Sequence, residues 1–556
     1  MFNHAQYTSS PAITLNNRQW PNHSIQHAPI WCAVDLRDGN QALIEPMSVG
    51  QKQTMWQLLI DMGFKHIEVG FPSASQPDYD FVRWLIEEDK IPKDVNIQVL
   101  VQARDSLIER TFEALTGVKQ AIVHVYNSTS PTQRAKVFNL DKQGIINIAV
   151  NGAQKVLQES KKYSNTQWSF EYSPESFSNT ELDFAVDVCN AVIEVWQPTI
   201  ENKAIINLPA TVESSMPNVF ADQVESFCRG INNRQNIIIS IHTHNDRGCA
   251  VAAAEMALLA GADRIEGTLM GNGERTGNMD IVTMAMNLYS QGIDPKIDIS
   301  NATRITTTVE QCTQIPTHPR HPWMGELVYT AFSGSHQDAI KKCLAVQETD
   351  QHWDVSYLPI NPQDIGRDYQ SVIRINSQSG KGGVAYILEN EFGITLPRWG
   401  QIELSQAVQH FSEEHQREVS AQDILRIFEG HFIHQKQPHT LASYQLTANN
   451  KCEENIHVQL NGDIQELDIQ GRGQGTITAF CDALSQEFAV TVDVIQYDQI
   501  TQGRHTSAHA MSFAHMKINN EKYLAAASQQ DSVGASLQAI LSGLNQFLLK
   551  RVTISK

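Results

Sequence analysis

The chain has 556 residues, of which 41% are hydrophobic and 19% charged, so it can bury a large core and is not globally disordered. Its formal net charge of −19 opposes binding to a phosphate backbone, and we expect no nucleic acid partner. We find no signal-peptide pattern, no run of about eighteen apolar residues and no paired CxxC spacing among the eight cysteines. These features predict a cytoplasmic protein without a membrane partner.

Short β-rich runs alternate with helical patterns between residues 31 and 269. The clearest helix follows the first run, where Ser48 and Gln51 form a candidate capping box and Gly63 can end the helix. One face of this helix is apolar, with Met55, Leu58, Leu59 and Met62. The β-rich runs predict eight strands, at Trp31–Asp35, His66–Gly70, Ile97–Val101, Ala121–Tyr126, Trp168–Tyr172, Ala204–Leu208, Ile237–His242 and Arg264–Leu269.

Eight strands separated by helices fit a (β/α)₈ TIM barrel, and strand counting alone also fits an open doubly wound sheet. We favour the barrel because polar side chains follow several strand ends, where the active sites of barrels lie. The fold class is therefore α/β, with residues 31–324 as the barrel and residues 1–30 as an N-terminal extension.

The rest of the chain changes character twice. Residues 325–434 are mixed and mostly helical, and they predict linker subdomains. Residues 435–556 contain a candidate hairpin, Ile456–Leu460 and Ile464–Ile469, joined at Asn461-Gly462. A strand–strand–helix pattern occurs twice in this part, which indicates a C-terminal α+β domain with internal pseudo-symmetry.

A candidate metal site follows the seventh strand. His242 and His244 are two residues apart, so at the end of a strand both imidazoles point to the same face. Asp38 follows the first strand, which is a near neighbour of the seventh in a closed ring of eight. Two imidazoles and a carboxylate form a metal site that leaves positions open for substrate. The alternative is two unrelated histidines in a loop.

Three further side chains at strand ends are candidates for catalysis or binding. Arg37 could stabilise negative charge on a substrate oxygen, or it could form a salt bridge with a neighbouring aspartate. Glu175 follows the fifth strand and could act as acid or base, or it could be a solvated loop carboxylate. Thr211 follows the sixth strand and could bind a carboxylate or cap the next helix.

A glycine-rich loop, Gly271–Asn278, follows the eighth strand. Loops at this place in barrels often bind phosphate, and glycine lets backbone N–H groups approach a ligand closely. Gly271 and Gly273 are therefore candidates for substrate binding. A plain tight turn is the alternative for such a short pattern.

These motifs together resemble the barrel superfamily named for its Asp–Arg–Glu signature, the DRE-TIM metallolyases. The three segments that carry the resemblance are Leu36–Gln41, His242–Asp246 and Gly271–Asn278. More narrowly, the chain is similar to the longer form of 2-isopropylmalate synthase at Ile67–Pro72, Phe170–Glu175, Asn207–Glu213, Ser333–Ile340 and Tyr357–Ile360. Asn40 stands where the wider superfamily has Glu, and Asn also occurs in the longer synthases.

The resemblance implies a Claisen-type condensation of acetyl-CoA with 2-oxoisovalerate and water, which gives 2-isopropylmalate and CoA on the way to leucine. It implies a divalent cation, Mg²⁺ first with Mn²⁺ or Zn²⁺ as alternatives, and it leaves activation by K⁺ open. Asp38, His242 and His244 become ligands, with Asn278 next to the metal. Arg37 becomes the oxyanion stabiliser, and His124 and Thr211 hold the oxo acid.

The resemblance also implies a homodimer with shared active sites. His336 and Tyr369 would be catalytic groups that the linker region brings over the barrel mouth of the partner subunit, although a histidine near a helix N-terminus is the alternative for His336. Either Glu175 or His336 could remove the methyl proton. The C-terminal domain would bind leucine, with Gly471, Gly473 and Ala535 as regulatory candidates. Its glycine turn, Gly471–Gly475, departs from the family pattern Gly-Asn-Gly-Pro.

Several other functions remain open on the sequence. Citramalate and homocitrate synthases share the same metal residues and differ in the oxo acid. A retro-aldol lyase of the superfamily fits less well with a long C-terminal extension. From a different class, the chain could be a non-catalytic leucine-binding regulator, although every proposed metal ligand is present.

Overall fold

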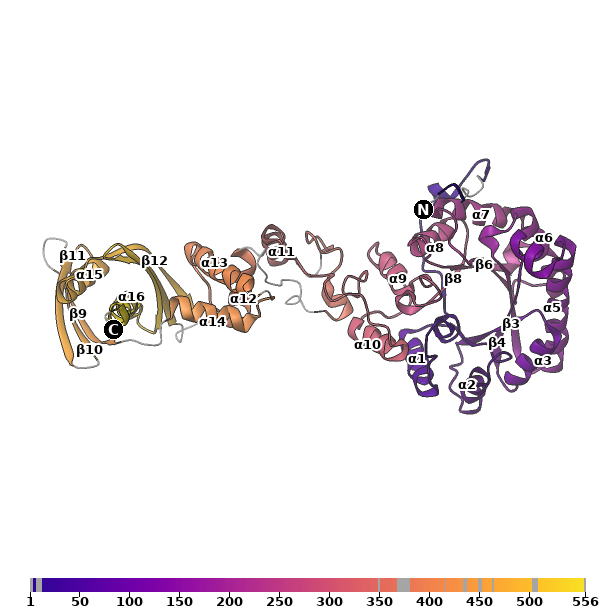
Figure 1. Cartoon of the computed structure of the whole chain (residues 1–556), viewed down its shortest axis with the longest axis horizontal. Coiled ribbons are helices and arrows are strands. Elements are labelled where there is room, and N and C mark those ends of the chain that lie inside the picture. Colours follow the sequence, from indigo (N-terminus) through magenta and orange to yellow (C-terminus); the bar gives the residue numbers. More distant parts are fainter. Residues whose placement is uncertain are drawn as a thin grey trace. The chain divides into compact units, whose positions relative to one another are not determined.

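The computed structural model describes residues 4–6, 13–348, 351–367, 381–415, 417–433, 438–448, 453–462, 465–502 and 509–554. The chain divides into two compact units, residues 1–328 with 364–366 and residues 329–363 with 367–556. Figure 1 shows the barrel of the first unit in indigo to magenta and the elements of the second unit in salmon to yellow. In the described parts, no helix is long and apolar enough to cross a membrane.

The first unit is a closed barrel of eight parallel strands in chain order, which confirms the barrel over the open sheet. The strands are β1 Ile30–Ala33, β2 His66–Gly70, β3 Asn96–Gln102, β4 Gln120–Ser128, β5 Gln167–Glu175, β6 Ala204–Ala210, β7 Ile237–Thr243 and β8 Arg264–Gly267. β1 pairs with both β2 and β8, and this last pairing closes the ring. All eight predicted strands are therefore present.

Helices surround the barrel (Figure 1). They are α1 Val49–Met62, α2 Gln76–Glu87, α3 Asp105–Ala114, α4 Pro131–Gln133, α5 Lys142–Lys162, α6 Leu182–Trp196, α7 Pro217–Gly230, α8 Ala250–Leu259, α9 Ile281–Tyr289 and α10 Ala302–Thr313. Short helical turns are η1 His4–Gln6, η2 Trp20–Asn22, η3 Asp35–Gly39, η4 Arg134–Phe138, η5 Phe177–Asn179, η6 Arg234–Asn236, η7 Leu269–Gly271 and η8 Pro362–Ile365.

The first helix forms as its sequence predicts. The Ser48 side chain accepts from the backbone of Gln51, and the Gln51 side chain accepts from the backbone of Ser48, so the capping box is present. Gly63 ends α1 with φ of 95°, a left-handed conformation that glycine adopts without strain. The four apolar residues of the predicted face are all buried. Helix α1 directly follows the loop that carries the residues after β1.

A segment that precedes β1 is bound to helix α7. The Arg18 guanidinium donates to both carboxylate oxygens of Asp222 at 2.6 Å, and the Trp20 indole donates to the same side chain at 2.8 Å. The backbone N–H groups of Gln19 and Trp20 donate to Glu225 at 3.0 Å. Because Asp222 and Glu225 are buried, these donors compensate two carboxylates that have left water. We call residues 16–20 the N-terminal strap.

In the residues that the structure describes, the second unit begins with the α-helices α11 Gly334–Val346, α12 Lys381–Phe392, α13 Arg398–His415 and α14 Ala421–Phe432. Helix α14 starts with a capping box between Ser420 and Asp423. The mostly helical character predicted for this region is confirmed in its described residues.

The C-terminal part of the second unit contains the same arrangement twice, three antiparallel strands followed by a helix. The first copy is β9 His439–Ala448, β10 Glu454–Gly462, β11 Glu466–Gly473 and α15 Thr476–Phe488. The second is β12 Val492–Gln502, β13 His509–Ile518, β14 Glu521–Gln529 and α16 Ser532–Ile554. The strand orders are β11-β10-β9 and β12-β13-β14, and both helices contribute to one apolar core.

The predicted pattern of two strands and a helix was therefore incomplete, because each copy has a third strand. Strand β14 contains three consecutive alanines, 525–527, and alanine has a low preference for strands. It forms a strand because it pairs along its whole length with β13. Strand β9 pairs in the same way with β10. Pairing with a neighbouring strand thus outweighs a weak local pattern at both places.

Candidate metal centre and active-site pocket

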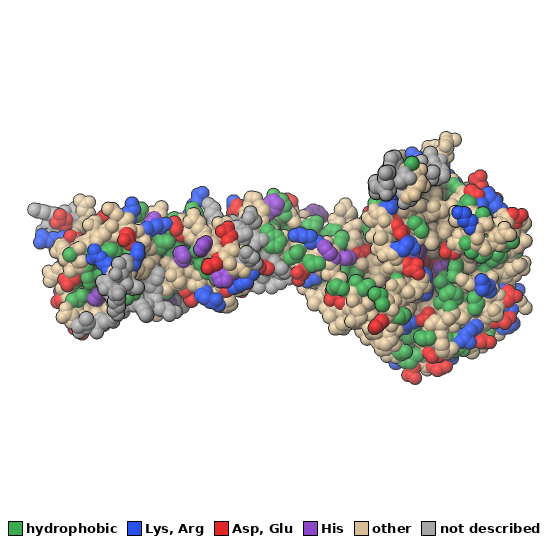
Figure 2. All heavy atoms as spheres, in the orientation of Figure 1, with side chains coloured by type: hydrophobic (Ala, Val, Ile, Leu, Met, Phe, Trp, Pro, Cys, Tyr) green, Lys and Arg blue, Asp and Glu red, His purple; other side chains and the backbone are tan. Residues whose placement is uncertain are grey.

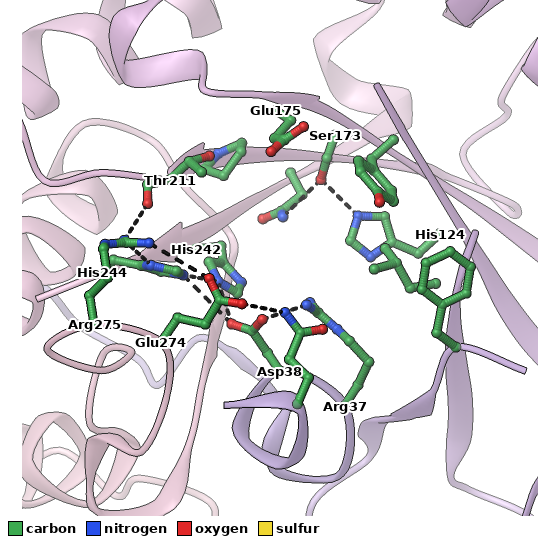
Figure 3. A pocket seen from close by; sticks show the side chains of 16 residues that line it. Arg37, Asp38, His124, Ser173, Glu175, Thr211, His242, His244, Glu274 and Arg275 are labelled. Carbon is green, nitrogen blue, oxygen red and sulfur yellow. Dashed lines mark hydrogen bonds and ion pairs between the residues drawn. The ribbon is translucent and has the colours of Figure 1, made fainter. Parts of the chain in front are cut away.

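The candidate metal ligands come together at the carboxyl ends of neighbouring strands. Asp38 lies in the short helix η3 directly after β1, His242 lies at the end of β7, and His244 follows β7. Nε2 of His242 lies 3.3 Å and Nε2 of His244 lies 3.6 Å from the same oxygen, Oδ2 of Asp38. The two Nε2 atoms are 3.2 Å apart. Figure 3 shows the three side chains directed toward one point.

The donor set fits a divalent cation. Oδ2 of Asp38 and Oδ1 of Asn278 are both buried and accept no hydrogen bond among the described residues. Asn278 is held against His244 by a β-bridge. A buried oxygen without a donor is costly unless something positive lies beside it. Carboxylate and amide oxygens with two imidazoles match the ligands of Mg²⁺, Mn²⁺ or Zn²⁺, so these four residues could hold one ion.

The other ring nitrogen of each histidine has a fixed partner. Nδ1 of His242 lies 3.0 Å from Oε2 of Glu266 on β8, which directs the Nε2 lone pair toward Asp38. Nδ1 of His244 faces the guanidinium of Arg275. Arg275 also donates to Asp246 at 2.7 Å. Because a guanidinium only donates, ligation through Nε2 of His244 requires Arg275 to give up its contact with this ring.

Arg37 lines the same cavity and forms the salt bridge that was one of the two roles considered for it. Its guanidinium donates to Oδ1 of Asp38 at 2.6 Å and also to Glu68. Burial opposes ionisation of Asp38, but Arg37 and the two imidazoles more than offset it and hold the pKa of this carboxyl well below its ordinary value. The salt bridge therefore keeps the candidate ligand charged, and the arginine remains exposed to the pocket.

A cavity of about 200 Å³ lies above these residues. It brings together seven of the predicted site residues with nine others; its lining is Arg37, Asp38, Gln41, Phe71, Leu100, His124, Tyr126, Ser173, Glu175, Asn207, Pro209, Thr211, His242, His244, Glu274 and Arg275. Figure 3 shows Glu175, Ser173 and His124 on one side of this space and the histidine pair with Asp38 on the other. One pocket thus joins the metal candidates to groups that could bind an organic acid.

Two of the predicted residues, His124 and Glu175, have defined positions in this pocket. Nδ1 of His124 lies 2.8 Å from Glu68, and its Nε2 lies 2.7 Å from Oγ of Ser173, so the ring is held on both sides. Glu175 ends β5 and accepts from the hydroxyl of Ser128, so it is a held carboxylate rather than a solvated one. Its other oxygen can face a substrate.

The alternative role considered for Thr211 is wrong. Helix α7 has Met216 as its N-cap, and the hydroxyl of Thr211 accepts from the backbone N–H of Ser176 at 2.9 Å. The threonine therefore ties the loop after β6 to the end of β5. It also lines the pocket, where its hydroxyl can donate to a substrate.

The glycine-rich loop after β8 contributes other residues to the pocket than the two glycines predicted. A Cβ on Gly273 would lie 2.3 Å from Nδ2 of Asn278, and Gly271 has φ of 73°. Both glycines therefore let the loop close tightly around the candidate ligand Asn278. The pocket lining includes Glu274 and Arg275 from this loop and neither glycine.

The remaining candidates lie in the second unit. His336 is in the first turn of α11, and its ring stacks on Tyr357 with centroids 4.0 Å apart. Tyr369 lies outside the described residues.

The regulatory candidates are tightly packed. A Cβ on Gly471 would lie 2.2 Å from the carbonyl oxygen of Ala479 in α15, and one on Gly473 would lie 2.5 Å from its nitrogen. These glycines let α15 pack directly on β11. Ala535 is buried in α16.

The sequence reasoning did not single out several polar residues as site residues. Ser173, Asn207, Glu274 and Arg275 line the pocket, and Glu68, Gln98, Glu171, Arg264 and Glu266 are buried polar residues of the barrel strands outside the lining. Glu68, Glu171 and Glu266 lie within strands of the barrel, and all three are buried. A charged residue inside a buried strand is costly unless it is paired, so this pattern was the signal that could have found them.

The closed barrel and the aspartate–histidine set at its carboxyl edge define a metal-dependent barrel enzyme. In agreement, the HMGL-like family model matches residues 28–309, the model "Alpha-isopropylmalate synthase, post-catalytic domain-like" matches residues 326–389, and "LeuA allosteric (dimerisation) domain" matches residues 418–548.

Curated relatives give a narrower assignment. The chain is 53% identical to the 2-isopropylmalate synthase of Alcanivorax borkumensis over 98% of both chains. It is 51% identical to that of Pseudomonas savastanoi, over 98% of this chain and 97% of the relative, and 49% identical to that of Ralstonia pickettii, over 98% and 96%. The chain therefore belongs to the 2-isopropylmalate synthases.

The candidate metal centre predicts a loss of cation binding when Asp38 loses its charge. In Asp38→Asn we expect Mn²⁺ affinity, measured by isothermal titration calorimetry, to fall by roughly 100-fold or more, since loss of an outer partner alone gives about 10–100-fold. Asp61→Asn is the control, because Asp61 pairs with Arg304 on the outside of the barrel. Wild-type Mn²⁺ affinity in a folded Asp38→Asn protein would contradict the assignment.

Proposed function

We propose that the chain condenses acetyl-CoA with 2-oxoisovalerate and water to give 2-isopropylmalate and CoA. The observation that supports this most directly is the single cavity in which Asp38, His242 and His244 lie beside Arg37 and an apolar wall. The family assignment adds the reaction type. A non-catalytic regulator is disfavoured, because a binding module has no need of this charged set at the barrel mouth.

The oxo acid would bind across the metal candidates. A divalent cation, Mg²⁺ first, would polarise the 2-oxo carbonyl when bound by Asp38, His242 and His244 with Asn278 beside it. His124 would donate to the substrate from the side opposite the metal candidates once Nε2 exchanges its contact with Ser173 for the substrate, and Thr211 would donate from beside His244. Mn²⁺ and Zn²⁺ are the alternatives to Mg²⁺, and K⁺ could activate the enzyme. Activity measured while each ion is added in turn would distinguish these possibilities.

Arg37 would act on the developing charge. When the acetyl carbon attacks, the former keto oxygen becomes an alkoxide, and a guanidinium already fixed by Glu68 needs no reorganisation to stabilise it. Glu175 and His336 are the two candidates for removing the methyl proton of acetyl-CoA. Glu175 is held by Ser128, and His336 would act with Tyr369 in the active site of the partner subunit of a homodimer. Water then hydrolyses the thioester.

The shape of the pocket favours 2-oxoisovalerate over the oxo acids of the sister synthases. Phe71 follows β2, Leu100 lies on β3 and Tyr126 on β4, and these neighbours give the pocket an apolar wall that suits an isopropyl group. Pro209, on β6, adds apolar lining elsewhere in the pocket. Homocitrate synthesis requires a cation for the second carboxylate of 2-oxoglutarate. The arginines of the lining, Arg37 and Arg275, are already paired with carboxylates. Citramalate synthesis would leave the wall in contact with only the methyl group of pyruvate.

The C-terminal part supports feedback control. We propose that residues 435–556 bind leucine and join two subunits, because residues 418–548 match the LeuA allosteric (dimerisation) model. The division into an extension (1–30), a barrel (31–324), linker subdomains that cover the partner's site (325–434) and this domain is part of the proposal. A cytoplasmic location agrees with the seven described cysteines, all of which are free thiols.

Substrate choice tests the proposed reaction. Thiol release from acetyl-CoA, measured with a panel of oxo acids, should give the highest kcat/KM with 2-oxoisovalerate. The two additional carbons buried against the wall contribute about 1.6 kcal/mol over pyruvate, or roughly tenfold in kcat/KM. Omission of oxo acid is the control for plain thioester hydrolysis. A preference for pyruvate or 2-oxoglutarate would exclude the isopropylmalate assignment.

Removal of the base should affect the chemical step more than binding. The base is either Glu175 or His336, so one of the two variants Glu175→Gln and His336→Ala lacks it. In that variant we expect kcat to fall by roughly 10²–10⁴-fold with little change in KM for the oxo acid. The same variant should stop exchange of the acetyl methyl protons with deuterated water, followed by NMR. Glu113→Gln, on the exposed face of α3, is the control. Near-normal kcat in both variants would rule out both candidates.

Leucine should inhibit through the C-terminal domain. We expect leucine to slow thiol release by the full chain and to leave a chain that ends at residue 434 unaffected. Size-exclusion chromatography of both chains would show whether the truncation also separates the dimer. Equal inhibition of the two chains would place the leucine site elsewhere, and no inhibition of the full chain would contradict the regulatory role.

A further inference from the structure

The centre of the barrel is filled by charged and polar side chains beneath the metal candidates. Arg264 on β8 is fully buried, and so are Glu171 on β5, Gln98 on β3 and Ser240 on β7. Barrel interiors are usually packed with branched apolar residues. A buried guanidinium is destabilising unless acceptors pair with its N–H groups and its charge. The acceptors around Arg264 therefore indicate the role of this residue.

Each of the three guanidinium nitrogens of Arg264 lies beside an acceptor. One terminal nitrogen lies 2.8 Å from Oε1 of Glu266 and 2.8 Å from Oγ of Ser240, and the other lies 2.6 Å from the amide oxygen of Gln98. Its Nε lies 3.2 Å from Nδ1 of His66. Glu171 is a more distant acceptor at 3.3 Å. The guanidinium is thereby fixed by four strands, and its shortest ion pair is with Glu266.

Glu266 connects this guanidinium to the metal candidates. In the sheet it lies in register with Cys32 of β1 on one side and His242 of β7 on the other. Its Oε1 accepts from Arg264 and from Gln98 at 3.1 Å, while its Oε2 lies 3.0 Å from Nδ1 of His242. The carboxylate therefore cannot turn away from His242 without losing its contacts to the arginine.

We propose that Arg264 is a positioning residue for metal binding, which acts through Glu266 to hold the imidazole of His242 with Nε2 toward Asp38. The order of contacts is Arg264 to Glu266, Glu266 to His242, and His242 to the ion. Fixing the orientation of one ligand reduces the entropy that the ligand loses when the ion binds. Arg264 itself lies outside the pocket lining and touches no substrate.

The competing explanation is that Arg264 only neutralises charge inside the barrel. Glu171 separates the two explanations, because it contacts the same guanidinium but does not contact His242. Burial raises the pKa of Glu171 well above its ordinary value, and Arg264 does not offset this effect. Glu171→Gln keeps the shape of this side chain and removes its ionisable group, so it tests the charge around Arg264 while the contact between Glu266 and His242 stays in place.

A double-mutant cycle in the full chain tests the proposal with Mn²⁺ as the probe. The proteins are wild type, Arg264→Met, Glu266→Gln, and the double variant, with Glu171→Gln as control. Mn²⁺ affinity is measured from the EPR signal of the free ion, with no substrate present, and thermal melting reports the fold. Because turnover is not the readout, a wrong oxo acid assignment leaves this test unaffected.

We expect Arg264→Met and Glu266→Gln each to weaken Mn²⁺ binding about tenfold or more, the range for outer partners of metal ligands. The double variant should bind as weakly as Glu266→Gln alone, because both changes break one chain of contacts. Glu171→Gln should keep wild-type affinity.

Three results would overturn the proposal: unchanged Mn²⁺ affinity in folded Arg264→Met, additive losses in the double variant, or an equal loss in Glu171→Gln. Should Arg264→Met fail to fold, Arg264→Lys takes its place in the cycle. Lysine keeps the charge but has one nitrogen in place of three, so the positioning role predicts weaker Mn²⁺ binding in this variant. Wild-type Mn²⁺ affinity in Arg264→Lys would then reject the role.

Discussion

Pairing between β1 and β8 is the constraint on which the site depends. The residues after β1 and those after β7 are about two hundred positions apart in the chain, and only closure of the ring brings them together. Once the ring is closed, β8 lies between β1 and β7, and Glu266 on β8 contacts His242 directly. An open sheet with the same strands would leave Asp38 at one edge and the histidines near the other.

The polar interior is the second condition for the site. Charged groups inside a barrel cost free energy unless each has its partner, and here Arg37, Arg264 and His124 are distributed among three buried glutamates. Because these side chains share hydrogen-bond partners, one of them cannot move without breaking the contacts of another. A barrel packed with leucine and valine in the same places would be simpler to stabilise, but it would hold the imidazoles less firmly.

Much of the barrel could be predicted because its strands are short, apolar and separated by clear helical patterns. The metal candidates could be predicted because the spacing of His242 and His244 carries its own geometry. Arg264 and Glu266 were missed as site residues because their contacts to His242, Ser240 and Gln98 are on other strands, which the sequence does not show. Strand β14 was missed for a related reason: its alanines form a strand only beside β13. Strands and side-chain roles that depend on residues far away in the chain could not be predicted from the neighbouring sequence.

The N-terminal strap makes the beginning of the chain part of the charge balance of helix α7. Asp222 and Glu225 are buried beneath it and receive their donors from Arg18, Gln19 and Trp20. A shortened version that starts at β1 would retain every catalytic candidate but would remove the donors that Arg18, Gln19 and Trp20 supply to Asp222 and Glu225. Protein engineers who fuse another domain to this end should therefore attach it ahead of residue 16.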